Sequence, residues 1–147
     1  MTTSQVLEVM KQKIGQAVGE IGGECPTYLD GFLIKYIETI NWILVSMGLD
    51  EEVTVDSDAV TITPDPTNKV GLLLAFGAAS NLISDDLAQK VKNGELGLSF
   101  STATTEITTN QAAITLSGTS KKLWSDFNSL FTAYMSEDPN TVIARQS

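Results

Sequence analysis

The side chains that could do chemistry in this chain are few, and they do not form a catalytic set. The 147 residues include no histidine, the side chain that most often serves as general base and metal ligand near neutral pH. The single cysteine, Cys25, has no partner for an intramolecular disulfide. We therefore expect a buried, unreactive thiol and no Ser–His or Cys–His nucleophile.

Acidic residues gather between positions 50 and 65, where a calcium site has to be considered. An EF-hand loop that begins at Asp56 would need glycine at its sixth position and glutamate at its twelfth. The chain has Thr61 and Thr67 at these positions. We interpret the cluster as a solvated acidic surface, and we expect no metal site.

Two further patterns resemble sites only faintly. Asp85 and Asp86 are adjacent on an expected helix, where neighbouring side chains point about 100° apart and cannot converge on one ion. Residues 118–121, GTSK, precede an expected helix but lack the spaced glycines of a phosphate-binding loop. The sequence therefore predicts no catalytic residue and no cofactor.

The charge balance limits the possible partners. With 9 basic and 18 acidic residues the net charge is −9, which argues against wrapping of nucleic acid and against adhesion to anionic lipid. The longest apolar run, at 70–79, is shorter than the roughly 20 residues that span a bilayer. The N-terminal residues do not follow the signal-peptide pattern. We expect neither specific DNA binding nor contact with a membrane.

Apolar periodicity predicts the elements that form the fold. Apolar residues recur every three or four positions from 3 to 21, from 28 to 47, from about 66 to 93 and from about 120 to 135, which is typical of amphipathic helices. Alternation around Asp56 to Asp58 predicts a hairpin of 53–55 with 60–63. The third helix is apolar nearly all round, so we expect it in the middle of a bundle or between subunits.

The segment 97–120 fits neither a helix nor an ordinary loop. It is rich in threonine and serine and carries one charged residue, Glu106; such side chains lower helix propensity. Alternation near both ends predicts a long, extended two-stranded arm. The expected fold is mainly α: a bundle of about four helices with a short hairpin and this arm before the last helix. Residues 1–135 would be one domain, followed by the tail 136–147.

The arm is the first candidate interaction site, because its apolar rim has little local surface to pack on. We expect an identical neighbour to cover it, with backbone pairing at a strand edge. The aromatic residues of the last helix fit either the core or a partner contact. The candidate arm contacts are Leu98, Phe100, Thr102, Ile107, Ile114 and Leu116.

The order of these parts resembles one known family of structural proteins. The segments that carry the resemblance are YIETINWIL at 36–44, VTVDSDAVTITPDP at 53–66, KNGELGLSFSTATTEITT at 92–109 and KKLWSDFNSLFTAY at 121–134. The chain resembles the head–tail connector, or adaptor, proteins of tailed bacteriophages, which form a ring beneath the portal. This family shares an arrangement of elements rather than invariant residues.

The resemblance implies a non-enzymatic virion protein of the neck, assembled in the host cytoplasm. It implies a ring of twelve copies between the portal protein and the tail or neck proteins, with DNA passing through an acidic lumen without specific binding. The segment after the long helix would embrace a neighbouring subunit. The C-terminal part would dock on the portal, through Trp124, Phe127, Phe131, Tyr134, Val142 and Ile143.

Two alternatives remain open from the sequence. The first is a tail-completion or terminator protein of the same virion. The second is an acidic, chaperone-like binding module that acts as a dimer on a partner protein.

Overall fold

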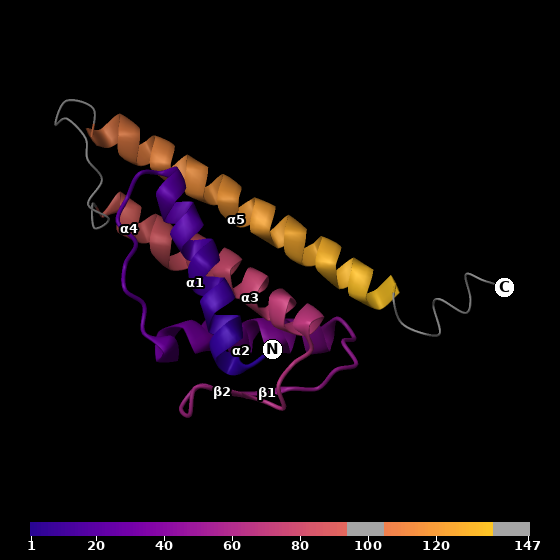
Figure 1. Ribbon diagram of the computed structural model, residues 1–147. Coiled ribbons are helices and arrows are strands. Elements are labelled where there is room, and N and C mark those ends of the chain that lie inside the picture. The colour runs from indigo at the N-terminus through magenta and orange to yellow at the C-terminus, as the bar shows by residue number, and fades with distance from the viewer. Residues whose placement is uncertain (94–104, 137–147) are drawn as a thin grey trace.

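The computed structural model describes residues 1–93 and 105–136, and for residues 105–109 it describes the backbone alone. It confirms a mainly helical fold with a short antiparallel hairpin (Figure 1). The elements in chain order are α1 (Thr3–Glu20), α2 (Asp30–Ser46), β1 (Thr54–Asp56), β2 (Thr61–Thr63), α3 (Asn68–Leu82), the π-helical turn η1 (Ile83–Leu87), α4 (Ala88–Lys92) and α5 (Thr105–Ser136).

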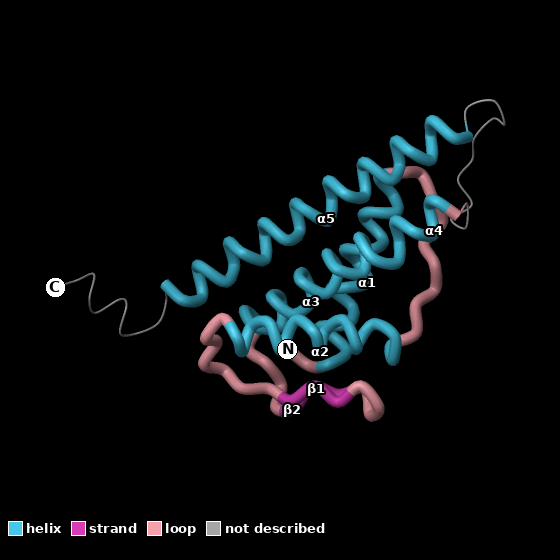
Figure 2. Tube along the Cα trace, turned by 180° about the vertical axis from the view of Figure 1, so that it is seen from behind, coloured by secondary structure: helices cyan, strands magenta, loops and turns pink. Residues whose placement is uncertain are grey.

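Helix α3 is the centre of the bundle. It contacts α1, α2 and α5, while α2 and α5 lie on opposite sides of it (Figures 1 and 2). Helix α5 runs back along η1 and α3, antiparallel to them (Figure 1). The helical stretch Asn68–Lys92 is long and apolar enough to cross a membrane, but 67% of its most apolar window is buried inside the bundle. A core helix accounts for that composition.

Small residues let the neighbouring helices approach α3 closely. A Cβ added at Gly77 would lie 3.0 Å from Ile40 of α2. On the α5 side, Ser80 Oγ donates to the Ser120 carbonyl oxygen at 2.8 Å, and both serines are buried. The predicted position of this helix inside a bundle is therefore confirmed.

Helix α3 begins at Asn68, slightly later than the expected start near residue 66. Thr67 is the N-cap residue, and its Oγ1 accepts a hydrogen bond from the Val70 amide at 3.4 Å. The same threonine donates its amide and its hydroxyl to the Glu51 carboxylate, at 2.9 and 2.8 Å. One member of the acidic cluster therefore anchors the loop before α3.

The expected continuous helix from 66 to 93 contains the π-helical turn η1. Ile83 and Leu87 remain fully buried across it. Asp86 of this turn accepts a hydrogen bond from the Tyr28 hydroxyl at 2.7 Å and lies 3.7 Å from Lys90. A π-turn accommodates an extra residue in a helix, and here its Asp86 ties the α1–α2 connection to the end of α3.

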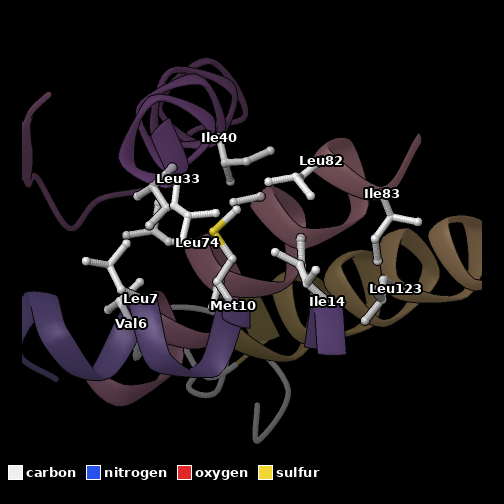
Figure 3. Packing of buried hydrophobic residues seen from close by; sticks show 14 of the residues in the cluster. Val6, Leu7, Met10, Ile14, Leu33, Ile40, Leu74, Leu82, Ile83 and Leu123 are labelled. Carbon is white, nitrogen blue, oxygen red and sulfur yellow. The ribbon is translucent and has the colours of Figure 1, made fainter. Parts of the chain in front are cut away.

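One hydrophobic core joins the helices (Figure 3). Helix α1 supplies a stripe on one face, as its periodicity predicts, and α1 and α2 both pack against α3 and contact each other. The fully buried large side chains include Met10, Ile14, Leu33, Ile37, Ile40, Leu44, Leu73, Leu74, Leu82, Ile83 and Phe127.

The hairpin closes one end of the bundle, next to α2. Val55 pairs with Ile62 in antiparallel register, and both side chains are buried. Asn41 of α2 donates its side-chain amide to the Val53 carbonyl oxygen at 3.1 Å. Asp56 Oδ1 accepts the amides of Asp58 and Ala59 at 3.0 and 3.1 Å, so this carboxylate closes a turn.

The predicted arm is wrong from Thr105 onward, because α5 begins there and continues without a break to Ser136. Residues 97–104 lie outside the described part of the chain. The buried positions of α5 recur every three or four residues, as a helix requires, and pack against α3 and η1. This burial outweighs the low helix propensity of threonine and serine. The buried residues are Ala112, Leu116, Ser120, Leu123 and Phe127.

Candidate interaction surface

The described residues show few features of an ion-binding or ligand-binding site. Within 1–93 and 105–136, no group of three or more cysteine, aspartate or glutamate side chains could hold a metal ion. A groove of about 510 Å³ between α1 and α3 is lined mainly by amide and aliphatic side chains, among them Gln5, Val9 and Gln12. Its lining carries one carboxylate, Glu8, and no thiol.

Cys25 is exposed rather than buried, contrary to the expectation from the sequence. Partial desolvation nevertheless raises the pKa of its thiol, so the thiolate is disfavoured. Reactive cysteines have lowered pKa values. The position therefore lacks the electrostatics of a nucleophile.

The predicted arm contacts do not form one surface. Leu98, Phe100 and Thr102 lie outside the described residues, and Ile107 lies in the part of α5 whose side chains are not described. Ile114 is 65% exposed, whereas Leu116 is fully buried. Two residues on a helix are about 200° apart, so this predicted pair points to opposite sides of α5.

The aromatic residues of α5 pack mostly inward. Phe127 is fully buried and stacks on Trp124 with ring centroids 4.7 Å apart. Trp124, Phe131 and Tyr134 are partly buried against the core. The assignment of Phe127 to a partner contact is therefore wrong, because it is a core residue of the subunit. Val142 and Ile143 lie outside the described residues.

The largest exposed apolar side chains gather instead on α2 and its two caps. We call them the α2 outer face: Leu29 is 76% exposed, Trp42 63%, Val45 54%, Met47 39% and Phe32 38%. They are spread along the length of α2 and over more than one of its exposed sides, since Val45 and Met47, two residues apart, point about 200° apart. Apolar residues occur around most of this helix, which predicts that other elements pack on more than one of its sides. Within the part of the subunit that the structure describes, these residues have no such packing partner. Such exposed patches mark interaction sites.

An aromatic row holds the N-terminal half of this face in place. The Phe32 ring stacks on Tyr28 at 5.7 Å and meets Tyr36 edge-on at 5.5 Å. Burial, followed by the hydrogen bond to Asp86 and its charge, raises the pKa of the Tyr28 hydroxyl. Burial and the charges of Asp85 and Asp86 also raise the pKa of Tyr36. Both phenols therefore stay protonated, and the row is neutral.

The α2 outer face carries charges of both signs, since the exposed Lys35 lies one turn before Glu38. Glu38 lies one turn before Trp42 on the same side of α2, and the exposed Asp50 and Glu52 follow the helix. On the outer side of α5 Lys121 is exposed, whereas Lys122 and the partly buried Asp126 line a groove with Glu20 of α1.

No protein-family model, no curated protein and no solved structure matches this chain. The α2 outer face is therefore interpreted from its own residues and their surroundings.

Proposed function

We propose that this protein is a structural virion protein, an adaptor subunit that forms a ring between the portal and the tail of a tailed bacteriophage. The observation that carries the proposal is the α2 outer face, with Trp42 63% exposed on a helix whose other side is fully buried. Tryptophan is enriched at the centres of protein interfaces. A surface of this kind fits a protein that works by assembly.

The arrangement of elements supports the same proposal. A core helix (α2), a short hairpin, a long helix rich in alanine and glycine (α3) and a long closing helix (α5) follow one another, in the order that underlies the resemblance to connector proteins. The net charge of −9 suits a channel through which DNA passes, because like charges prevent the wall from holding the DNA.

The proposed partners are further copies of this chain, twelve in a ring, the portal protein and the tail or neck proteins. Neither a cofactor nor a membrane has a part in this function. The portal contact is assigned to the chain beyond the end of α5 at Ser136. Val142 and Ile143 are the aliphatic anchor of that segment.

A binding experiment separates the proposal from its alternatives. The purified 147-residue protein is incubated with purified portal rings or with purified tail tubes, and the complexes are separated by sedimentation and viewed by electron microscopy. An adaptor adds a ring of density to the portal. Binding to the end of the tail tube without portal binding would identify a terminator protein. A stable dimer that ignores both would contradict assembly in the neck and favour the chaperone-like module.

A further inference from the structure

We infer that two copies of this chain form an antiparallel, two-fold symmetric contact through one side of α2. Gly31, Lys35, Glu38 and Trp42 follow one another at intervals of four, three and four residues, which places them along one side of a helix. We call these four residues, together with Val45 one turn further, the Trp42 stripe. The inference goes beyond the proposed function, because it concerns the protein before it meets a portal.

The Trp42 stripe is directed away from the core of its own subunit. The buried residues of α2 are centred about 120° away around the helix axis. Trp42 is 63% exposed and Val45 54%, and Lys35 is exposed as well. Phe32 lies about 100° away around the same axis, so it is not part of the stripe. The residues of the stripe are therefore accessible together from one direction.

The Trp42 stripe is complementary to its own reversed copy. Its intervals of four, three and four residues are the same in both directions along the helix. In an antiparallel contact centred between positions 35 and 38, Lys35 of each copy lies opposite Glu38 of the other. Gly31 then lies opposite Trp42. Each pair forms twice, because a two-fold contact joins the same surface of both copies.

The charges of the stripe favour the antiparallel direction. Within residues 1–93 and 105–136, neither Lys35 nor Glu38 forms an ion pair inside the subunit, so both can pair across the contact. Complementary charges fix the register of an interface and disfavour wrong arrangements. A parallel contact would bring each of these side chains against its own like charge in the other copy.

The sizes of Gly31 and Trp42 support the same register. A Cβ at Gly31 would meet nothing within 4 Å, so the surface above this glycine is open. The large indole of Trp42 from the other copy can lie there while the two helices stay close. The distance between packed helices depends on the side chains at the contact, and a large residue opposite a glycine keeps that distance short.

The size of the contact predicts a weak, reversible dimer. The stripe is about 20 Å long, and its largest side chain, Trp42, exposes roughly 150 Å². Stable interfaces bury about 800 Å² on each partner, which is more than one side of this helix offers. The net charge of −9 on each copy opposes association, and physiological salt screens it beyond about 8 Å. We expect a dissociation constant of about 1–100 µM.

Charge reversal tests this contact in the purified 147-residue protein without portal. Sedimentation equilibrium from about 1 to 200 µM at about 0.15 M salt measures the dissociation constant of the dimer. Lys35→Glu and Glu38→Lys should each raise it at least about tenfold, because each brings like charges together twice. The chain with both substitutions should return to within about threefold of wild type, because both pairs are again of opposite sign. Circular dichroism should stay unchanged in all three variants.

Filling the space above Gly31 tests the register without a change of charge. Gly31→Gln should raise the dissociation constant at least about tenfold, because the new side chain occupies the place of the indole from the other copy. The matched control is Gly19→Gln on α1, an exposed glycine that also has nothing within 4 Å of an added Cβ. This control should dimerise like wild type. Equal effects of the two substitutions would contradict the proposed register.

The remaining outcomes separate this inference from the proposed function. A protein that stays monomeric over the whole concentration range, or that forms species larger than a dimer, would overturn the two-fold contact. So would a dimer that neither single charge reversal weakens. Portal-bound rings from a protein that is monomeric alone would leave the adaptor function standing. A dimer with the predicted charge dependence that ignores portal rings would support the contact and count against the adaptor function.

Discussion

Ser80 and Ser120 each donate a hydrogen bond to the backbone carbonyl oxygen of the other, at 2.8 and 2.9 Å. Their hydroxyl oxygens lie 3.2 Å apart, and both residues are buried in the contact between α3 and α5. This reciprocal pair fixes how far α5 can slide along α3. It therefore also fixes which residues of α5 face outward.

Removing either hydroxyl should destabilise the subunit. Ser80→Ala and Ser120→Ala should each lower the free energy of unfolding by about 1 kcal/mol, as expected for one buried hydrogen bond. Because the two bonds share a site, the double variant should differ from the sum of the singles. Urea unfolding followed by circular dichroism measures this. Ser129→Ala, exposed on α5, is the control and should change stability by less than about 0.5 kcal/mol.

Gly77 should not tolerate a side chain. A Cβ there would lie 3.0 to 3.1 Å from three atoms of Ile40, so Gly77→Ala should lower the free energy of unfolding by about 1–3 kcal/mol despite the better helix propensity of alanine. Gly19→Ala in α1 has open space and should raise stability by up to about 1 kcal/mol. If both variants were stabilised, the close approach of α2 and α3 would be refuted.

The hydrogen bond from Tyr28 to Asp86 should make the fold sensitive to alkaline pH. In the unfolded chain the Tyr28 phenol loses its proton near pH 10, whereas its raised pKa keeps it protonated in the folded state. Above about pH 10 the unfolded state thus binds fewer protons, and stability falls as pH rises. Below that pH the contribution is fully present.

The variant Tyr28→Phe should be less stable at neutral pH, and its stability should depend less on alkaline pH. At pH 7 it should be about 1 kcal/mol less stable than wild type because the hydrogen bond is lost. Its stability should then fall less steeply between pH 10 and pH 12, as measured by urea unfolding at a series of pH values. Parallel pH curves for the two proteins would contradict the link between this phenol and the alkaline loss of stability.

Trp42 and Phe127 should respond to truncation in opposite ways. Phe127→Ala should destabilise the subunit by about 3–5 kcal/mol, since the ring is fully buried. Trp42→Ala should leave the thermal midpoint of the subunit nearly unchanged and reduce assembly, because the ring is largely exposed. Thermal unfolding and sedimentation separate the two effects. A large loss of subunit stability in Trp42→Ala would show that it serves the core.

Much of the fold can be predicted from periodicity, and the errors of that prediction have physical causes. The stripes of α1, α2 and α3 are long and regular, so the sequence is enough to place them. In α5 the pair Ile114 and Leu116 suggests a strand, while Ala112, Leu116 and Ser120 follow the helical spacing. Local propensity favours the first interpretation, and packing along α3 decides for the second.

The candidate surface was harder to predict than the fold. An apolar residue on a helix indicates burial, but the sequence does not say whether its own subunit or another one covers it. Trp42 continues the apolar pattern of α2, and its exposure becomes visible once α3 has taken the opposite side. Phe127 is an aromatic residue of the kind that often anchors an interface. Its position within the buried stripe of α5 nevertheless places it in the core.

The mass of the purified protein, alone and with portal rings, tests the central claim most directly. Native mass spectrometry or light scattering on the 15.8 kDa chain should show a ring-sized complex of twelve copies on the portal. Trp42→Ala should fail to complete that ring. A stable free dimer whose mass does not change when portal is added would contradict the adaptor function.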